Sequence, residues 1–179
     1  MNTTTQQKRF LSKTIAGFTL LETLVAISLL LISVVGPLGL ISRSLANAFV
    51  AKDRVVASFL AEEGIEYVRS IRDSNMLNET GWLNGVEGPC GGSGCTIDTK
   101  SGAISSCPSG GCSPLLFNSS DGFYAYAAGE ESRFTRTITI IPGTGAHSHE
   151  ALIRVEVDWR TGAVNPPPLI LEEYISEWI

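Results

Sequence analysis

The sequence has few of the groups on which most enzymes and nucleic-acid-binding proteins depend. It contains two histidines and shows no GxSxG, HExxH, P-loop or dinucleotide-binding motif. Its 13 Lys and Arg residues are outnumbered by 18 Asp and Glu, which gives a formal net charge of −5. A surface of that sign repels phosphate. We therefore expect no enzymatic activity, no catalytic residue, no cofactor and no nucleic-acid partner.

The two histidines and a neighbouring acid are the candidates for a metal site. His147, His149 and Glu150 form the motif HSHE, and imidazole and carboxylate groups both bind zinc. The three share one glycine-flanked loop, where nothing in the sequence fixes their geometry. We interpret them as a solvated hairpin tip and predict no metal ligand there. The acidic pairs at 130–131 and 172–173 are interpreted as a solvated face, because they lack the dense Asp, Asn and Gly pattern of a calcium site.

Charged side chains are also nearly absent from residues 18–41, FTLLETLVAISLLLISVVGPLGLI. At a rise of 1.5 Å per residue, this segment forms a helix of about 36 Å, enough to span a bilayer core with some tilt. The apolar region of a secretory signal is shorter, about 7–15 residues, and ends in small residues before its cleavage site. No such site follows here, so we predict that residues 18–41 are retained as a transmembrane helix. An uncleaved signal anchor is the simplest interpretation of the hydrophobicity alone.

Glu22 is the one ionisable residue between Phe18 and Ile41, and an anchor alone does not explain it. An unpaired acid inside a membrane costs about 2.5–3.5 kcal/mol on insertion scales, and less near the interface. A cationic partner would arise if the chain were cut between Gly17 and Phe18, because the cut creates a new α-ammonium group. In a bundle of identical helices, Glu22 of one subunit would reach the ammonium group of the next.

The stretch GFTLLE at residues 17–22 closely resembles the prepilin signature of type IV pilins and type II secretion pseudopilins. The resemblance implies that a prepilin peptidase cuts after Gly17 and methylates the new N-terminus at Phe18. It also implies that Glu22 sets the registry of subunits during assembly. Residues 1–17 would be the removed cytoplasmic leader, and they are polar, basic and free of acids, as expected of a cytoplasmic segment. The remaining chain would carry 10 basic and 18 acidic residues, a formal charge of −8.

Beyond the span the pattern becomes amphipathic, so we predict one helix from Phe18 to about Ser74 whose part at 42–74 packs against a globular head. The Gly-Pro-Leu-Gly sequence at 36–39 predicts a kink or a locally melted turn. A coiled-coil dimer is the competing interpretation, but the heptad pattern is short and interrupted. The apolar stripe of the outer part consists of Leu45, Phe49, Val56, Leu60, Tyr67 and Ile71, widened by Val55, Phe59 and Val68.

All four cysteines lie within residues 75–122, a stretch rich in Gly, Ser, Asn and Pro that we interpret as a long connecting loop. An even number of cysteines in a segment outside the cytoplasm favours disulfides. Of the three possible connectivities we favour Cys90–Cys95 with Cys107–Cys112, because a six-residue ring with glycines inside closes easily. A crossed pairing and a zinc site of four cysteines are the alternatives.

The C-terminal residues 123–179 show the two-residue alternation of half-buried strands. The alternation is clearest in RFTRTITII at 133–141 and ALIRVEVDWR at 151–160, and 123–127 and 169–174 complete the sheet as neighbours. The predicted fold class is α+β, with one long N-terminal helix packed on a small antiparallel sheet of three or four strands. The resemblance to pilins implies the same fold.

The head adds a second, looser resemblance, because LAEEGIEYVRSIRD, RFTRTITI, RVEVDW and EYISEW are similar to segments of V-type minor pilins and the I-type minor pseudopilin. Together the resemblances imply a minor filament subunit whose partners are prepilin peptidase, other pilin or pseudopilin subunits, the assembly machinery and the membrane. The protein would cross the inner membrane once, with its head extracytoplasmic, and would then join a pilus or pseudopilus. The alternatives are an adhesion module at a filament tip and a simple membrane-anchored extracytoplasmic protein.

Overall fold

A computed structural model describes residues 17–162 and 165–177 of the chain. The leader expected at 1–17 therefore lies outside the described residues, apart from its last residue. The chain divides into two compact units, residues 1–45 and 46–179, which are described separately below. The α+β class is confirmed, since one long N-terminal helix packs on antiparallel sheets.

The long helix α1 spans Leu20–Leu77 and continues through Gly36 and Pro37. The predicted melted turn is therefore wrong. Proline removes one backbone donor from the helix, but this single missing bond lies among 58 helical residues. Neighbouring hydrogen bonds are enough to keep the helical conformation on both sides of the proline.

In the second unit, the face of α1 that packs on the sheet includes three small residues. Ala57, Ala61 and Gly64 are buried there, and a Cβ placed on Gly64 would lie 3.1 Å from Cδ1 of Ile138. By contrast Phe59, which the apolar stripe places in the contact, is 66% exposed. The stripe is confirmed at Leu60 and Val68, which are buried, and at its partly buried members Val56, Tyr67 and Ile71. It is wrong at the exposed residues Phe49, Val55 and Phe59, because close approach of the sheet also requires small residues. The buried residues of α1 are Asp53, Ala57, Leu60, Ala61, Gly64, Ile65 and Val68.

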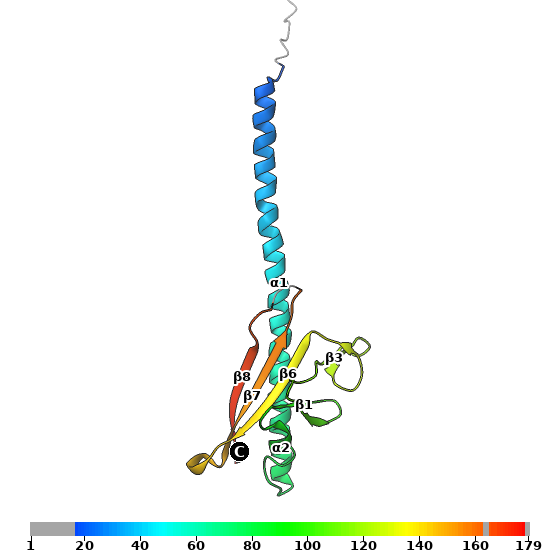
Figure 1. The fold of residues 1–179 in the computed structure, drawn as a ribbon, viewed down its shortest axis with the longest axis vertical. Helices are drawn as coiled ribbons and strands as arrows, with labels where there is room; N and C mark the ends of the chain where they lie inside the picture. Colours follow the sequence, from blue (N-terminus) through cyan, green and yellow to red (C-terminus); the bar gives the residue numbers. More distant parts are fainter. Residues whose placement is uncertain (1–16, 163–164, 178–179) are drawn as a thin grey trace, which may run out of the picture. The chain divides into compact units, whose positions relative to one another are not determined.

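The main sheet has five antiparallel strands in the order β2-β1-β6-β7-β8, and α1 lies against one of its faces (Figure 1). The inward side chains of its long strands alternate with outward ones, as the sequence pattern predicts. The strands are β1 (Cys95–Ile97), β2 (Ile104–Ser106), β6 (Phe134–Pro142), β7 (Glu150–Trp159) and β8 (Leu169–Ser176).

The region 75–122 is more ordered than the predicted loop. It contains the short helix α2 (Glu87–Cys90) and the strands β1, β2 and β3 (Leu116–Asn118). Its β1 pairs with β6, so the main sheet has five strands instead of the three or four predicted. These strands are three residues long and are positioned by disulfides and tertiary contacts, so they leave little periodicity in the sequence.

A second, small sheet has the order β4-β3-β5. Its strand β4 (Phe123–Ala125) was expected in the main sheet but pairs with β3, and β5 (Glu130–Glu131) pairs with the other edge of β3. Tyr124 of β4 makes an edge-to-face contact with Phe134 of the main sheet, at 5.7 Å between ring centroids. This aromatic contact joins the small sheet to the core.

Candidate functional site

The start of α1 carries the residues that the prepilin signature singles out. Gly17 and Phe18 precede the helix in an irregular segment, and the Phe18 side chain is 75% exposed. A Cβ on Gly17 would meet no other atom within 4 Å. The Gly17–Phe18 peptide bond therefore lies outside regular secondary structure and in open surroundings, as a bond must to enter a peptidase active site.

Glu22 lies in the first turn of α1 and belongs to a helix cap that sequence reasoning missed. Its backbone N–H donates to Oγ1 of Thr19 at 3.2 Å, and Thr19 directly precedes the first helical residue. The order Thr-x-x-Glu is that of a capping box, in which the acid at the third helical position completes the cap. The positive end of the helix dipole also favours a carboxylate there. The capping-box signal was present at residues 19–22.

Side chains of the first unit are exposed along the whole of the described segment 17–45. α1 is long and apolar enough to cross a membrane, and none of its most apolar stretch is buried within the protein. Three hydroxyl groups of this apolar stretch are satisfied within the helix, because each donates to a carbonyl one turn earlier. These bonds are Thr23 to Leu20 and Ser28 to Leu24 at 2.8 Å each, and Ser33 to Leu30 at 2.8 Å. Such a helix is compatible with a membrane anchor.

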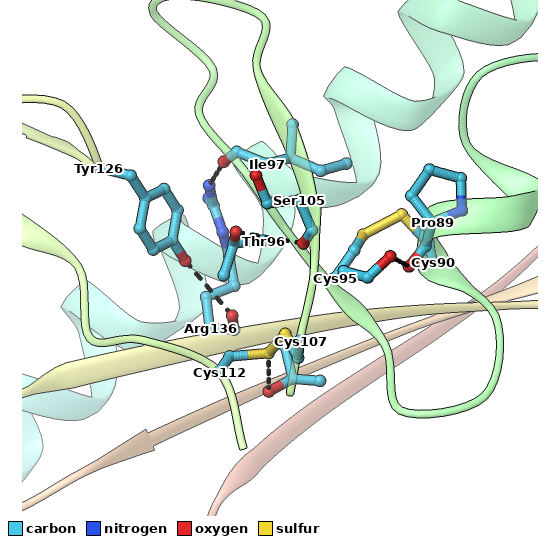
Figure 2. Close-up of a disulfide and its surroundings, with 12 residues drawn as sticks. Pro89, Cys90, Cys95, Thr96, Ile97, Ser105, Cys107, Cys112, Tyr126 and Arg136 are labelled. Atoms are coloured by element: carbon cyan, nitrogen blue, oxygen red, sulfur yellow. Dashed lines mark hydrogen bonds between the residues drawn. A yellow bond between two sulfur atoms is a disulfide. The ribbon is translucent and has the colours of Figure 1, made fainter. Parts of the chain in front are cut away.

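The structure contains two disulfides, Cys90–Cys95 and Cys107–Cys112, which are the pairs favoured from the sequence (Figure 2). Each sulfur is bonded to its partner, so the four cysteines do not form the alternative zinc site. Cys90 and Cys95 are both fully buried in the core, whereas Cys107 is 8% exposed. The first disulfide joins the end of α2 to the start of β1 and thereby ties both elements into the head.

Backbone contacts fasten this clipped region onto β6. Cys95 pairs with Ile138 in the sheet register, and the N–H of Cys107 donates to the carbonyl of Gly94 at 2.9 Å. Gly94 has a φ of 79°, and a Cβ there would lie 2.7 Å from Cγ2 of Thr137. Cys90, Cys95 and Cys107 are therefore part of the folded head, whereas residues 108–111 inside the second ring are exposed.

Asp98, at the end of β1, organises the turn that follows. It is 3% exposed, and its carboxylate accepts hydrogen bonds from the N–H groups of Lys100 and Ser101 at 3.0 Å each and of Tyr126 at 2.9 Å. Burial acts to raise the pKa of Asp98, but these three backbone donors outweigh it, and the pKa is lowered. The carboxylate thus joins the main-sheet hairpin to the segment after β4.

The HSHE loop does not bring its three candidate ligands together. It contains the short 3₁₀ helix η1 (Gly145–His147) between β6 and β7. His147 Nδ1 lies 3.1 Å from the Glu150 carboxylate, whereas His149 pairs with Glu177. Both histidines are exposed. The two imidazoles have separate carboxylate partners, so the three candidate ligands do not converge on one point.

The two residues of the acidic pair at 172–173 differ in their surroundings. Glu172 is exposed and pairs with Arg154 of β7 at 2.8 Å. Glu173 points to the other face of β8, where it pairs with Arg69 of α1. The prediction of one solvated face is therefore wrong for Glu173, because consecutive residues of a strand point to opposite faces. Its carboxylate joins β8 to α1.

We compared the chain with protein-family models, with curated proteins and with solved structures. None of the three comparisons gives a match.

Proposed function

We propose that the protein is a minor pilin or pseudopilin, a structural subunit of a type IV pilus or type II secretion-like filament that is assembled from the inner membrane. The observation that carries the proposal is the order of features at the start of α1. An irregular Gly17–Phe18 junction is followed by an exposed apolar helix with Glu22 in its first turn. The GFTLLE sequence there resembles the prepilin signature.

The chemistry of the junction supports this function. Cleavage after Gly17 would place a positive α-ammonium group on Phe18, four residues before the one acid of the apolar stretch. An ammonium–carboxylate pair between two subunits would remove the cost of a lone charge in an apolar environment. Methylation of the amine retains its positive charge. The pair would therefore align neighbouring helices before the subunits leave the membrane.

The layout of the second unit is in keeping with the proposal. The outer half of α1 packs on an antiparallel sheet, which is the general arrangement that the resemblance to pilins implies. The Cys90–Cys95 disulfide is built into that head, since both residues are fully buried. This burial argues for a structural role of the first disulfide. The ring of the second disulfide exposes residues 108–111, so the adhesive alternative is confined to that ring.

The cap at Thr19 offers a second explanation for Glu22, and one pair of variants distinguishes the two. Glu22→Gln keeps a side chain that completes a capping box but removes the charge, whereas Glu22→Ala removes both. Ser33→Ala is the matched control, because it removes a polar group from the same helix without touching charge. If Glu22 acts by pairing with an amine, both Glu22 variants should be processed and membrane-bound yet absent from sheared filaments.

Immunoblots of membranes and of sheared filaments measure this outcome. Normal incorporation of Glu22→Gln together with failure of Glu22→Ala would assign the residue to capping and contradict the assembly role. Mass spectrometry of the mature protein tests the cleavage itself. We expect an N-terminal methylated Phe18. An intact Met1 terminus would favour a simple anchored protein.

A further inference from the structure

β8 forms one edge of the main sheet, and its outer side pairs with no other described strand. It is eight residues long, longer than a typical strand of five to six. Figure 1 shows β8 at the border of the sheet, beside β7. Proteins commonly protect such edges with lysine or other charged residues, proline or a bulge. The sequence LILEEYIS has two charged residues, Glu172 and Glu173, but no lysine or proline. The opposite edge, β2, is only three residues long.

The register shows which backbone groups of β8 face outward. The N–H of Glu177 donates to the carbonyl of His149 at 2.9 Å, in the same register that pairs β7 with β8. Hydrogen-bonded and non-bonded pairs alternate along an antiparallel ladder. The odd-numbered residues of β8 therefore bond to β7. It follows that Ile170, Glu172 and Tyr174 direct their N–H and C=O groups to the open edge.

The same three residues also project their side chains from the sheet face opposite α1. Ile170 is 43% exposed and Tyr174 is 73% exposed, and Glu172 lies between them. Tyr174 is opposite Leu152 of β7, which is opposite Ile141 of β6. A hollow of about 510 Å³ next to the β6–β7 hairpin is lined by Ile141, Leu152 and Tyr174. An added strand would extend this apolar row by one residue.

The charged side chains around Glu172 indicate which kind of strand would pair with β8. On the outer face Arg154 pairs with Glu172 and also with Glu156, so one positive charge faces two negative ones. A basic residue opposite Glu172 would balance this group, since opposite charges across a strand pair are favourable. A second copy of β8, paired antiparallel so that Ile170 lies opposite Tyr174, would instead place Glu172 opposite Glu172. Like charges in that position are destabilising.

We propose that the open edge of β8 binds an extended segment of a different polypeptide as an added antiparallel strand. The segment carries a basic residue opposite Glu172 and apolar residues opposite Ile170 and Tyr174. Main-chain hydrogen bonds supply the affinity and the alternate side chains supply the specificity, as in other strand-addition complexes. All residues involved lie in the second unit, so this inference does not depend on the function proposed for Glu22.

The test uses the full chain in neutral detergent micelles and a fluorescent peptide, Thr-Val-Thr-Lys-Thr-Val-Thr. In the proposed register the backbone N–H and C=O groups of its valines and lysine bond to β8. The backbone groups of the inner threonines, at peptide positions three and five, point away from β8. Fluorescence anisotropy should show saturable binding. N-methylation of the valines and lysine should abolish this binding, whereas N-methylation of the inner threonines should preserve it. The modification is made on the peptide, so the protein remains unaltered.

A charge exchange tests the specificity. Glu172→Lys should weaken binding of the lysine peptide about two- to fivefold, the range expected of one cross-strand charge pair. A peptide with glutamate in place of lysine should recover the loss. Absence of binding, or binding that ignores the N-methylation pattern, would overturn the proposal. If a peptide of the β8 sequence bound more tightly than the lysine peptide, the occupant would be a second copy, which would also overturn it. The filament proposal would stand in each case.

Discussion

The guanidinium of Arg136 donates to the carbonyl of Ile97 at 2.7 Å, from a side chain that is 1% exposed (Figure 2). The same group donates to the carbonyl of Leu60 at 2.9 Å and pairs with Glu63 at 3.0 Å. One buried cation thus joins β6 to β1 and to α1. The arginine positions the short strand β1, which belongs to the region that the sequence pattern leaves as a loop.

Replacing this arginine should therefore loosen the attachment of β1. Arg136→Met keeps much of the side-chain volume but removes the buried donor from the carbonyl of Ile97 and the cation from Glu63, and we expect a loss of about 3 kcal/mol in the free energy of unfolding. Urea titration followed by circular dichroism measures the loss. Arg154→Met is the control, because Arg154 makes exposed ion pairs that contribute about 0–1 kcal/mol. Equal effects of the two variants would contradict the role assigned to Arg136.

The two disulfides permit a comparison in which ring size cancels. Each closes a loop with a sequence separation of 5, so their effects on the unfolded chain should be equal. The double variant Cys90→Ser/Cys95→Ser places two hydroxyl groups in the fully buried site. We expect it to be less stable than Cys107→Ser/Cys112→Ser by about 1–3 kcal/mol, the cost of burying poorly satisfied polar groups. Thermal unfolding of both variants, side by side, tests this order.

Asp98 should make the head less stable in acid. Because its pKa is lowered on folding, its contribution is present above the ordinary aspartate pKa of about 3.9 and is lost as the pH falls through the folded value. Asp98→Asn should cost about 1–2 kcal/mol at pH 7, since an amide has one acceptor oxygen for three donors. The variant should also show a shallower fall of stability between about pH 5 and 2. Urea unfolding across this pH range measures both effects.

Asp121→Asn is the matched control for the acid experiment. The pKa of Asp121 is lowered first by its hydrogen bond with Lys100 and then by the N–H of Phe123, at an exposed position. Salt screens an exposed pair of this kind. Added salt should therefore reduce the acid sensitivity due to Asp121 while leaving that of Asp98. If salt removed the acid sensitivity due to Asp98 as well as that due to Asp121, the buried backbone hydrogen bonds around Asp98 would not be the cause of its effect.

Four features of this protein are indicated by local sequence alone. The apolar run at 18–41 predicts a long helix that is exposed along its length. Its composition is uniformly apolar, so it can be identified without knowing which other residues it contacts. The strands β6 and β7 are equally evident, since their alternation extends over nine and ten residues. Ring size favours the two cysteine pairs that the structure contains. The Thr-x-x-Glu order at residues 19–22 is also a local signal, and it indicates the helix cap at Thr19.

Tertiary structure decided the rest. Which face of α1 is buried depends on how closely the sheet approaches, and Gly64 and Ala61 permit that approach where Phe59 does not. The strand β1 exists because a disulfide and the Arg136 guanidinium hold three residues against β6. Glu172 and Glu173 are alike in sequence, yet the pleat of β8 directs one to the outer face and the other to α1. Such contacts join residues far apart in the chain, so no local pattern specifies them.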